Sequence, residues 1–362
     1  MITFLIFMAV LGVLVLVHEL GHFIVARRSG MKVEEFGFGF PPKLFGIKRG
    51  ETVYSINLIP FGGFVKIFGE DGDNRDKLRS FGSRPISVRL GVIIAGVVMN
   101  FLFAVLLLTL GNFFGLRIGL FDEAIALSAR DKKIQIIQVV PESPAEKAGL
   151  SILDEIVGFE KDGVILETKT TEEVQKFTSE NKGQTLTIII RNGRELVRKE
   201  IQARLNPPPG EGSMGIAMAL TGVVSYPWYE AVWRGANDTL ILTTNTAYGY
   251  YVLFKTLVTD GRLIGEVSGP VGIASVTGQA ARVGFSYLMQ FVALISVNLA
   301  VLNIIPFPAL DGGRAAMLLV EKVKGKPIDK KIESALNGIG FALLITLMIY
   351  VTIKDITKFF TV

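Results

Sequence analysis

The two histidines of this chain lie four positions apart, in the segment His18-Glu-Leu-Gly-His22. Residues at i and i+4 of a helix share one face, so both imidazoles can bind the same metal ion. Glu19 lies between them and is the type of residue that acts as a general base at such sites. Residues 2–17 are almost entirely apolar, which places this candidate site inside a membrane helix. Two satisfied histidines on an apolar face are the simpler alternative, but polar groups at membrane depth are costly and usually functional.

Asp311 is the candidate third ligand. It follows a later apolar segment, residues 287–305, which is ended by Pro306 and Pro308. A helix must break there because proline lacks a backbone donor. Two imidazoles and one carboxylate leave the fourth position of a tetrahedral zinc ion open, as at catalytic sites. A water bound there has its pKa lowered toward neutrality, and Glu19 can take its proton during attack on a carbonyl. The residues alone leave a second interpretation open, in which Asp311 caps the following helix.

The composition limits the class of protein. Half of the 362 residues are hydrophobic, and long uncharged runs indicate a membrane protein. The absence of cysteine excludes disulfides, thiolate zinc sites and cysteine nucleophiles. The net charge of +5 comes from basic residues at the ends of apolar segments. Membrane topology accounts for that pattern, so we expect no nucleic-acid partner.

The chain is expected to cross the membrane four times. The predicted spans are residues 2–25, 90–115, 287–305 and 336–357. A further aromatic-rich helix, residues 228–258, is interrupted by charged and polar residues and is expected to lie at the membrane interface. Basic residues follow the first span and precede the last. The positive-inside rule therefore places both chain ends outside the cytosol and the metal site near the cytosolic side.

Residues 33–68 are expected to form a small β-sheet. They are rich in glycine, aromatic and β-branched residues, which is typical of strands and turns. The segment is too short and too interrupted to span a bilayer. Strands at membrane depth must be paired or line a cavity, so we predict a sheet that dips into the membrane beside the first helix. A cytosolic hairpin is the alternative.

Residues 123–206 predict a soluble mixed α/β domain. Short β-branched strands alternate with polar positions, residues 172–178 read as a helix, and Asn192-Gly193 supplies a hairpin turn. The domain ends at a stiff proline linker, residues 206–210. It follows an outward span and is therefore expected outside the cytosol. The predicted parts are thus a first membrane segment, this domain and a second membrane segment, at residues 1–122, 123–206 and 207–362.

Two motifs and one domain signature resemble those of bacterial site-2 proteases, the intramembrane zinc metalloproteases. The similarity is to the regulator-of-sigma-E-protease type with a single PDZ domain and covers essentially the whole chain. The first motif is His18-Glu-Leu-Gly-His-Phe23, and the second runs from Asn303 to Gly313. Pro141 to Leu150 is similar to the bacterial PDZ signature, but Leu153-Asp154 stands where Gly-Asp is usual. That departure puts carboxylate binding by the PDZ domain in question.

The resemblance implies a complete set of roles. His18, His22 and Asp311 would be the zinc ligands and Glu19 the catalytic base. Asn303 would help to hold the substrate, together with the broken helix around Pro306 and Pro308. The implied substrates are single-span membrane proteins, such as a trimmed anti-sigma factor or a remnant signal peptide. The implied location is the bacterial inner (plasma) membrane, in contact with the lipid bilayer, and the oligomeric state stays open.

The predicted sheet suggests how a substrate is held. A helix hides its amides in internal hydrogen bonds, and exposing them in lipid costs several kcal/mol per group. An edge strand can replace the lost bonds by pairing with the extended substrate. Two segments are candidates for this strand, Tyr54 to Leu58 and Phe64 to Ile67, and the candidate contact residues are Tyr54, Ser55, Ile56, Asn57, Leu58, Phe64 and Val65. The soluble domain would act as a size filter for substrates.

Two other functions are considered. A non-proteolytic, PDZ-bearing membrane binding protein with a structural metal site is the main alternative, although Glu19 and the open ligand position argue against it. A metal transporter would need more ionisable residues inside its spans. Asn100, the strongly polar residue of the second span, either bonds a neighbouring helix or supports the site.

Overall fold

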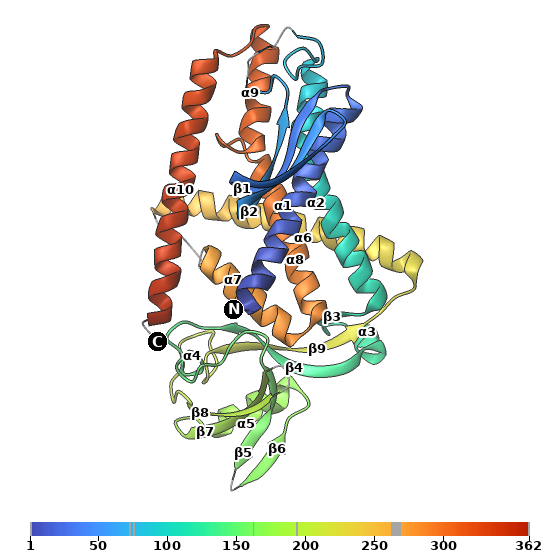
Figure 1. Cartoon of the computed structure of the whole chain (residues 1–362). Coiled ribbons are helices and arrows are strands. Elements are labelled where there is room, and N and C mark those ends of the chain that lie inside the picture. Colours follow the sequence, from blue (N-terminus) through green and yellow to red (C-terminus); the bar gives the residue numbers. More distant parts are fainter. Residues whose placement is uncertain are drawn as a thin grey trace. The chain divides into compact units, whose positions relative to one another are not determined.

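The computed structural model describes residues 2–71, 74, 77–161, 163–192, 195–261 and 269–360. The chain forms two compact units (Figure 1). The first, which we call the membrane unit, contains residues 1–109, 232–278 and 289–361. The second, which we call the sheet domain, contains residues 110–231 and 279–288. Each unit is described by itself.

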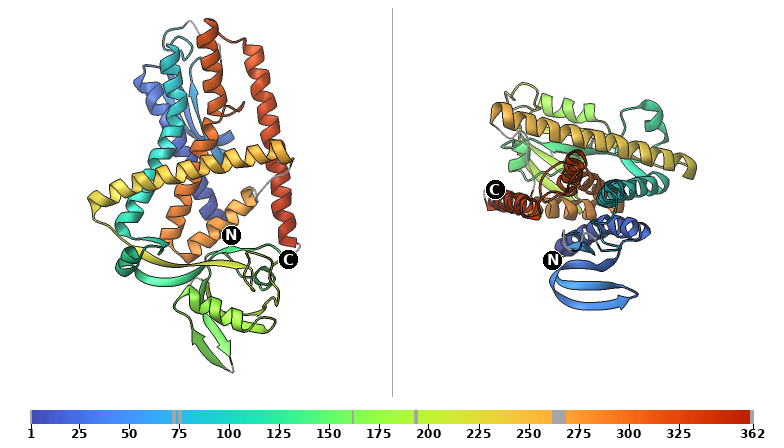
Figure 2. Two further views of the ribbon diagram at one scale, coloured as in Figure 1. Left: turned by 180° about the vertical axis from the view of Figure 1, so that it is seen from behind. Right: turned by 90° about the horizontal axis from the view of Figure 1, so that it is seen from above.

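Four of the described helices are long and apolar enough to cross a membrane. They are α1 (Ile2–Arg28), α2 (Ile86–Phe114), α8 (Phe285–Ile304) and α10 (Lys330–Phe360). All four predicted spans are thus confirmed as helices, and their bounds lie within six residues of those expected. Helix α6 (Trp228–Asp260) is not among the candidate spans, and it runs transverse to α2 and α10 (Figure 2). The described part of this unit also contains α9 (Asp311–Lys324) and residues 270–278 of the helix α7 (Pro270–Val283).

A small antiparallel sheet lies beside α1. It consists of β1 (Val33–Arg49) and β2 (Thr52–Ile67). Both strands bend, so that the first half of β1 pairs with both halves of β2, as in Phe36 with Tyr54 and with Val65. The second half of β1 pairs with residues 52–57. The order of segments across the sheet is therefore 63–67, 33–40, 52–59 and 43–49.

This order decides between the two candidate strands for substrate pairing. Tyr54, Ser55 and Ile56 each pair on one side with residues 36–38 and on the other with residues 45–47. Their backbone is used on both sides, so the prediction that Tyr54 to Leu58 is a pairing edge is wrong. The segment 63–67 has a partner on one side within the described residues. It remains the edge that can accept another strand.

The far end of the small sheet exposes apolar side chains. Phe40, Leu44, Phe45, Ile47 and Leu58 are all at least 48% exposed. The end of the sheet near Ile67 is instead buried. Ile67 and Val33 pack there with residues of α1, α2 and α9 in one core, formed by Ala26, Met31, Val33, Ile67, Phe81, Val92, Ile93 and Leu318.

The sheet domain is built on an antiparallel sheet of seven described strands. The strands run in the order β3-β9-β4-β5-β7-β8, with β6 paired to β5. Their bounds are β3 (Leu116–Gly119), β4 (Arg130–Val139), β5 (Glu155–Lys161), β6 (Val164–Glu167), β7 (Thr185–Asn192), β8 (Glu195–Gln202) and β9 (Ile216–Val224). Three helices lie between them, α3 (Glu123–Ser128), α4 (Pro144–Lys147) and α5 (Thr171–Glu180).

The domain extends beyond the predicted limits of residues 123–206. Strands β3 and β9 lie outside these limits, and β9 pairs with both β3 and β4. The predicted helix is α5, which begins with a capping box between Thr170 and Glu173. The predicted hairpin is β7–β8, although Gly193 of its turn lies outside the described residues. The core is apolar and includes Ile136, Ile156, Phe159, Ile188 and Ile190.

Candidate metal centre and active site

Two histidines from α1 and one aspartate from α9 converge on one point. The Nε2 atoms of His18 and His22 are 3.2 Å apart. The Oδ2 atom of Asp311 lies 3.0 Å from His18 Nε2 and 3.3 Å from His22 Nε2. These residues form the group of possible metal ligands found among the described residues. Segments almost three hundred positions apart are thus brought together, as the sequence predicted.

The spacing of these atoms fits a zinc ion. Tetrahedral zinc with bonds of about 2.0–2.1 Å places neighbouring ligand atoms about 3.3 Å apart. The three observed separations, 3.0 to 3.3 Å, agree with that value. Oδ2 of Asp311 is also buried and has no hydrogen-bond partner among the described residues. Three ligand atoms that face one another without a bridging proton donor are the arrangement that a cation stabilises.

One face of helix α2 orients the imidazoles of His18 and His22. His22 Nδ1 lies 2.8 Å from the carbonyl oxygen of Val92 and donates its proton there, which leaves Nε2 for the metal. The amide of Asn100 lies 3.3 Å from His18 Nδ1. Oδ1 of Asn100 is buried without a partner among the described residues, and a 180° rotation of the amide lets it accept the His18 Nδ1 proton. Both histidines then offer Nε2 to the same ion.

Gly96 lies between these two contacts on the same face of α2. A Cβ atom at this position would lie 2.5 Å from His22 Nε2 and 2.6 Å from His18 Cε1. Contacts this short do not occur, so any side chain here would displace the metal-binding atoms. Glycine at position 96 is therefore a requirement of the site.

Asp311 is held by a tightly packed loop between α8 and α9. It is the first residue of α9 but not its cap, because Leu310 occupies the N-cap position and no side chain caps the helix. The capping interpretation of Asp311 is thus wrong. Cβ atoms on Gly312 and Gly313 would each lie 2.2 Å from a loop carbonyl oxygen. Ala309 adopts a left-handed φ of 73°, and its N–H donates to Asn337 of α10 at 3.2 Å.

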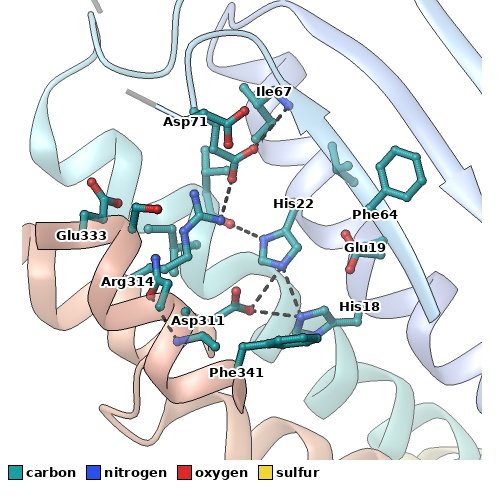
Figure 3. A pocket seen from close by; sticks show the side chains of 18 of the residues that line it. His18, Glu19, His22, Phe64, Ile67, Asp71, Asp311, Arg314, Glu333 and Phe341 are labelled. Carbon is teal, nitrogen blue, oxygen red and sulfur yellow. Dashed lines mark hydrogen bonds and ion pairs between the residues drawn. The ribbon is translucent and has the colours of Figure 1, made fainter. Parts of the chain in front are cut away.

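The convergent atoms open into a cavity of about 820 Å³ (Figure 3). Glu19 lines this cavity together with the three candidate ligands. Phe64 and Val65 of the free sheet edge line it too, and Glu19 points toward that edge (Figure 3). Phe341 of α10 also lines this cavity. The cavity thus brings a candidate base, a candidate metal centre and an unpaired strand edge together.

Charged side chains that line the cavity shift one another's pKa values. Burial raises the pKa of Asp311, but the neighbouring imidazoles of His18 and His22 lower it more, so its pKa lies well below the usual range. Arg314, one turn after Asp311, forms an ion pair with Glu70 at 2.7 Å. Burial lowers the pKa of Arg314, and Glu70 more than offsets this. Asp311 and Arg314 are both charged at neutral pH.

The structure separates the other predicted site residues into two groups. Phe64 and Val65 lie at the cavity, as described. Asn303, Pro306 and Pro308 are not among the described residues that line it. Pro308 instead packs against α10, where a Cβ atom on Gly340 would lie 2.4 Å from its carbonyl oxygen. The segment Tyr54 to Leu58 lies inside the sheet, and Asn57 donates to the Gly39 carbonyl at 3.0 Å.

Sequence reasoning missed four residues that shape the site: Gly96, Asn337, Glu70 and Arg314. A signal was available for Gly96, since Val92, Gly96 and Asn100 recur at i, i+4 and i+8 on one helix face. The spacing of Arg314 from Asp311, three positions, likewise places both on one face of α9. Glu70 and Asn337 carry no local signal, because their partners are far away in sequence.

Comparison with known proteins relates the chain to zinc metalloproteases. Residues 6–347 match the model of peptidase family M50. A Clostridium perfringens protein with a provisional zinc metalloprotease name is 39% identical over 344 residues, 95% of each chain. The zinc metalloprotease RasP of Geobacillus kaustophilus is 30% identical over an alignment 433 positions long, which covers 98% of this chain and 97% of the relative. The regulator of sigma-W protease RasP of Bacillus subtilis is 28% identical over 99% of each chain.

The chain therefore belongs to peptidase family M50, the site-2 proteases. It is a multi-pass membrane protein and an intramembrane zinc metalloprotease. The family implies zinc as its cofactor, and the donor set of two imidazoles and one carboxylate fits that metal.

Proposed function

We propose that His18, His22 and Asp311 hold the zinc ion and that Glu19 is the catalytic base. The observation that carries this assignment is the convergence of three ligand atoms within 3.3 Å of one another, with Glu19 in the same cavity. When bound, zinc supplies Lewis acidity that polarises a carbonyl and lowers the pKa of water. Glu19 takes the proton of the attacking water and returns it to the leaving amine.

The substrate is proposed to be the transmembrane segment of a single-span protein. Its amides must leave their helical hydrogen bonds before the zinc site can reach a peptide bond. The edge segment Phe64 to Ile67 has no partner strand on one side within the described residues, and it lies next to the candidate ligands. Strand pairing there replaces the lost helical bonds and holds the substrate extended at the metal.

The exposed apolar side chains of the small sheet support its placement in the bilayer. Phe45 is 58% exposed and Ile47 is 57% exposed, values that water would penalise and hydrocarbon would not. Residues 36–38 and 54–56 are paired on both sides, which satisfies backbone groups that lipid cannot. The end of α1 and the start of α10 lie at one end of the membrane unit (Figure 1), and the basic pairs Arg27-Arg28 and Lys330-Lys331 lie there. That end is proposed to be cytosolic.

The sheet domain is proposed to be an extracytoplasmic PDZ domain that filters substrates by the size of their outer part. The signature from Pro141 to Leu150 and the antiparallel sheet with α4 and α5 support this assignment. Because the B. subtilis relative is named a regulator of sigma-W protease, trimmed anti-sigma factors are proposed as substrates, with remnant signal peptides as a second class. A deletion that tests the filter must remove Leu116 to Val224, since β9 pairs with β3 and β4.

A paired assay on the purified full chain tests the catalytic assignment. Zinc content and cleavage of a generic single-span substrate are measured for the wild type and for Glu19→Gln. We expect one zinc per chain in both proteins and cleavage by the wild type alone. Equal cleavage by both proteins would contradict the role of Glu19. Loss of zinc from Glu19→Gln would show that the residue holds the site together instead.

Proline substitutions test strand pairing. Proline removes one backbone donor, and successive residues of a strand alternate in the direction of their N–H groups. Val65→Pro and Lys66→Pro are therefore made separately, and one of them removes an outward donor. We expect that variant to keep its zinc and lose cleavage. The matched controls, Ile47→Pro and Lys48→Pro, lie on the opposite edge of the same sheet and should cleave normally.

A further inference from the structure

A carboxylate is fixed at the end of the free sheet edge. The edge segment ends at Ile67, and the chain then turns back. The N–H of Glu70 donates to the Ile67 carbonyl at 3.2 Å, and the Ile67 N–H donates to Glu70 Oε2 at 3.3 Å. These two reciprocal bonds hold the Glu70 side chain at a constant distance from the last edge residue.

The guanidinium of Arg314, which comes from the helix that carries Asp311, binds this carboxylate. Its Nη1 lies 2.7 Å from Glu70 Oε1. Arg314 is three positions after Asp311 in α9, so the two side chains lie on the same helix face one turn apart. The Glu70 side chain is 17% exposed and the Arg314 side chain 30%. The pair is therefore only partly screened by solvent, and it lines the cavity.

The same face of α9 continues with two further contacts. Leu318 packs in the core that contains Ile67 and Val33. Glu321 then forms a buried ion pair with Arg89 of α2 at 2.8 Å. Apolar packing is non-directional and allows small sliding movements, whereas charged hydrogen bonds fix both direction and distance. Of the described contacts between α9 and the end of the sheet edge, the Glu70–Arg314 pair is the one that fixes position along the strand.

We infer that Glu70 and Arg314 are a positioning pair that selects which peptide bond of the substrate is cut. The inference rests on the proposed function, in which the substrate pairs with Phe64 to Ile67 and Asp311 holds the metal. The pair connects these two parts through a turn of three residues on one side and one helical turn on the other. It thereby sets the offset between the paired substrate strand and the metal centre.

Loss of the Glu70–Arg314 pair would let the paired substrate strand shift relative to the metal centre, and this shift has a recognisable consequence. Strand pairing repeats every two residues, because a slip of one residue turns every side chain to the opposite face. Without the pair, the substrate strand should therefore reach the metal in registers two residues apart. The wild type should release one main pair of products. A variant without the pair should release additional products whose ends differ by two residues.

The test uses the purified full chain and a single-span substrate, with product masses measured by mass spectrometry. The variants are Glu70→Gln and Arg314→Gln, together with the charge-exchanged double variant Glu70→Arg/Arg314→Glu. The matched control is Glu51→Gln, which breaks the exposed ion pair with Arg79 at the turn of the same sheet. Zinc content is measured for every variant.

We expect Glu70→Gln and Arg314→Gln to keep one zinc per chain and to cut at additional positions two residues from the original one. The charge-exchanged variant should restore at least half of the cleavage to the original position. Glu51→Gln should resemble the wild type. A single unchanged cut in both single variants would overturn the inference, whatever their rates. Zinc loss in proportion to lost activity would overturn it too, because the pair would then only support the metal site.

The experiments distinguish failure of the proposed strand pairing from failure of the positioning role. If proline at both Val65 and Lys66 leaves cleavage unchanged, strand pairing itself is wrong. If one proline variant is inactive while Glu70→Gln still cuts at one position only, pairing stands and the positioning role fails. If Glu70→Gln is inactive but retains zinc, the charge-exchanged variant decides: recovered cleavage at the original position supports the inference, and no recovery overturns it.

Discussion

The two units of this protein distribute polar and apolar residues in opposite ways. In the sheet domain, Phe159 and Ile188 are fully buried in an apolar core. In the membrane unit, large apolar side chains such as Leu106 (51% exposed) face outward. The same unit buries Asn100 and Ser296 completely, and Ser296 donates to the Asn100 carbonyl at 2.7 Å.

The difference shows what each unit uses its interior for. In water, burial of apolar surface is the main source of stability, so the sheet domain places its apolar residues inside. In lipid that driving force is absent between helices, and close packing and buried polar contacts replace it. The interior of the membrane unit is then available for chemistry. Asn100 is one such buried polar residue, and its amide lies 3.3 Å from His18 Nδ1 at the candidate metal centre.

The largest effect is expected when an apolar side chain is removed from the core of the sheet domain. Phe159→Ala should destabilise that domain by about 3–5 kcal/mol, the usual result for a fully buried phenylalanine. Phe45→Ala, on the exposed face of the small sheet, should change the stability of the protein in detergent by about 0.5 kcal/mol or less. Hydrogen exchange of the full chain, read separately for each unit, measures both. Similar losses in the two variants would contradict the comparison.

A smaller effect should follow from filling the interior of the membrane unit. Gly96→Ala places a methyl group against both imidazoles, and we expect about a 100-fold loss of zinc affinity, at the upper end for groups that orient metal ligands. Chelator competition measures the affinity. Gly91 is on the same helix and has no atom within 4 Å of an added Cβ, so Gly91→Ala is the matched control and should bind zinc normally.

A backbone change in the sheet domain should have an effect of about 1 kcal/mol. Leu153 adopts a φ of 75°, a left-handed conformation that costs about 1–2 kcal/mol for residues other than glycine. Leu153→Gly removes this cost but increases the entropy of the unfolded chain, which leaves a net gain of about 1 kcal/mol or less. Thermal unfolding of the full chain, followed by exchange in the sheet domain, provides the measurement. A lower unfolding temperature would show that the Leu153 side chain contributes more than its backbone costs.

The smallest effect concerns the pH dependence of the small sheet. Burial raises the pKa of Glu35, but the Lys43 ammonium and the Ser55 hydroxyl lower it more, so its pKa lies below the usual range. A depressed carboxyl pKa stabilises the folded state above the unfolded value of 4.5, and that contribution is lost as the pH falls through the folded pKa. We expect opening of residues 33–59 to become easier below pH 4 by about 0.5 kcal/mol. Glu35→Gln should remove this dependence, as measured by hydrogen exchange.

Much of the fold and site was predictable because local patterns carried it. The four apolar segments specify spans by length and hydropathy alone. The spacing of His18 and His22 specifies a shared helix face, and the two prolines after residue 305 specify a helix break before Asp311. Leu153 also left a signal, since it stands where the PDZ signature that this segment resembles has glycine, and its φ of 75° is one that glycine adopts easily.

The pairing of segments was decided only by the tertiary structure. Residues 54–58 and 64–67 have similar β-branched and aromatic composition, and no local pattern tells which one is the free edge. The bends in β1 and β2 place the first segment inside the sheet and the second at its edge. The contacts of Gly96, Asn337 and the Glu70–Arg314 pair likewise join residues far apart in sequence. The sequence by itself determined the spans and indicated the candidate metal ligands, whereas the three-dimensional packing decided which strand edge faces them, because edges and close approaches exist only once the segments are assembled.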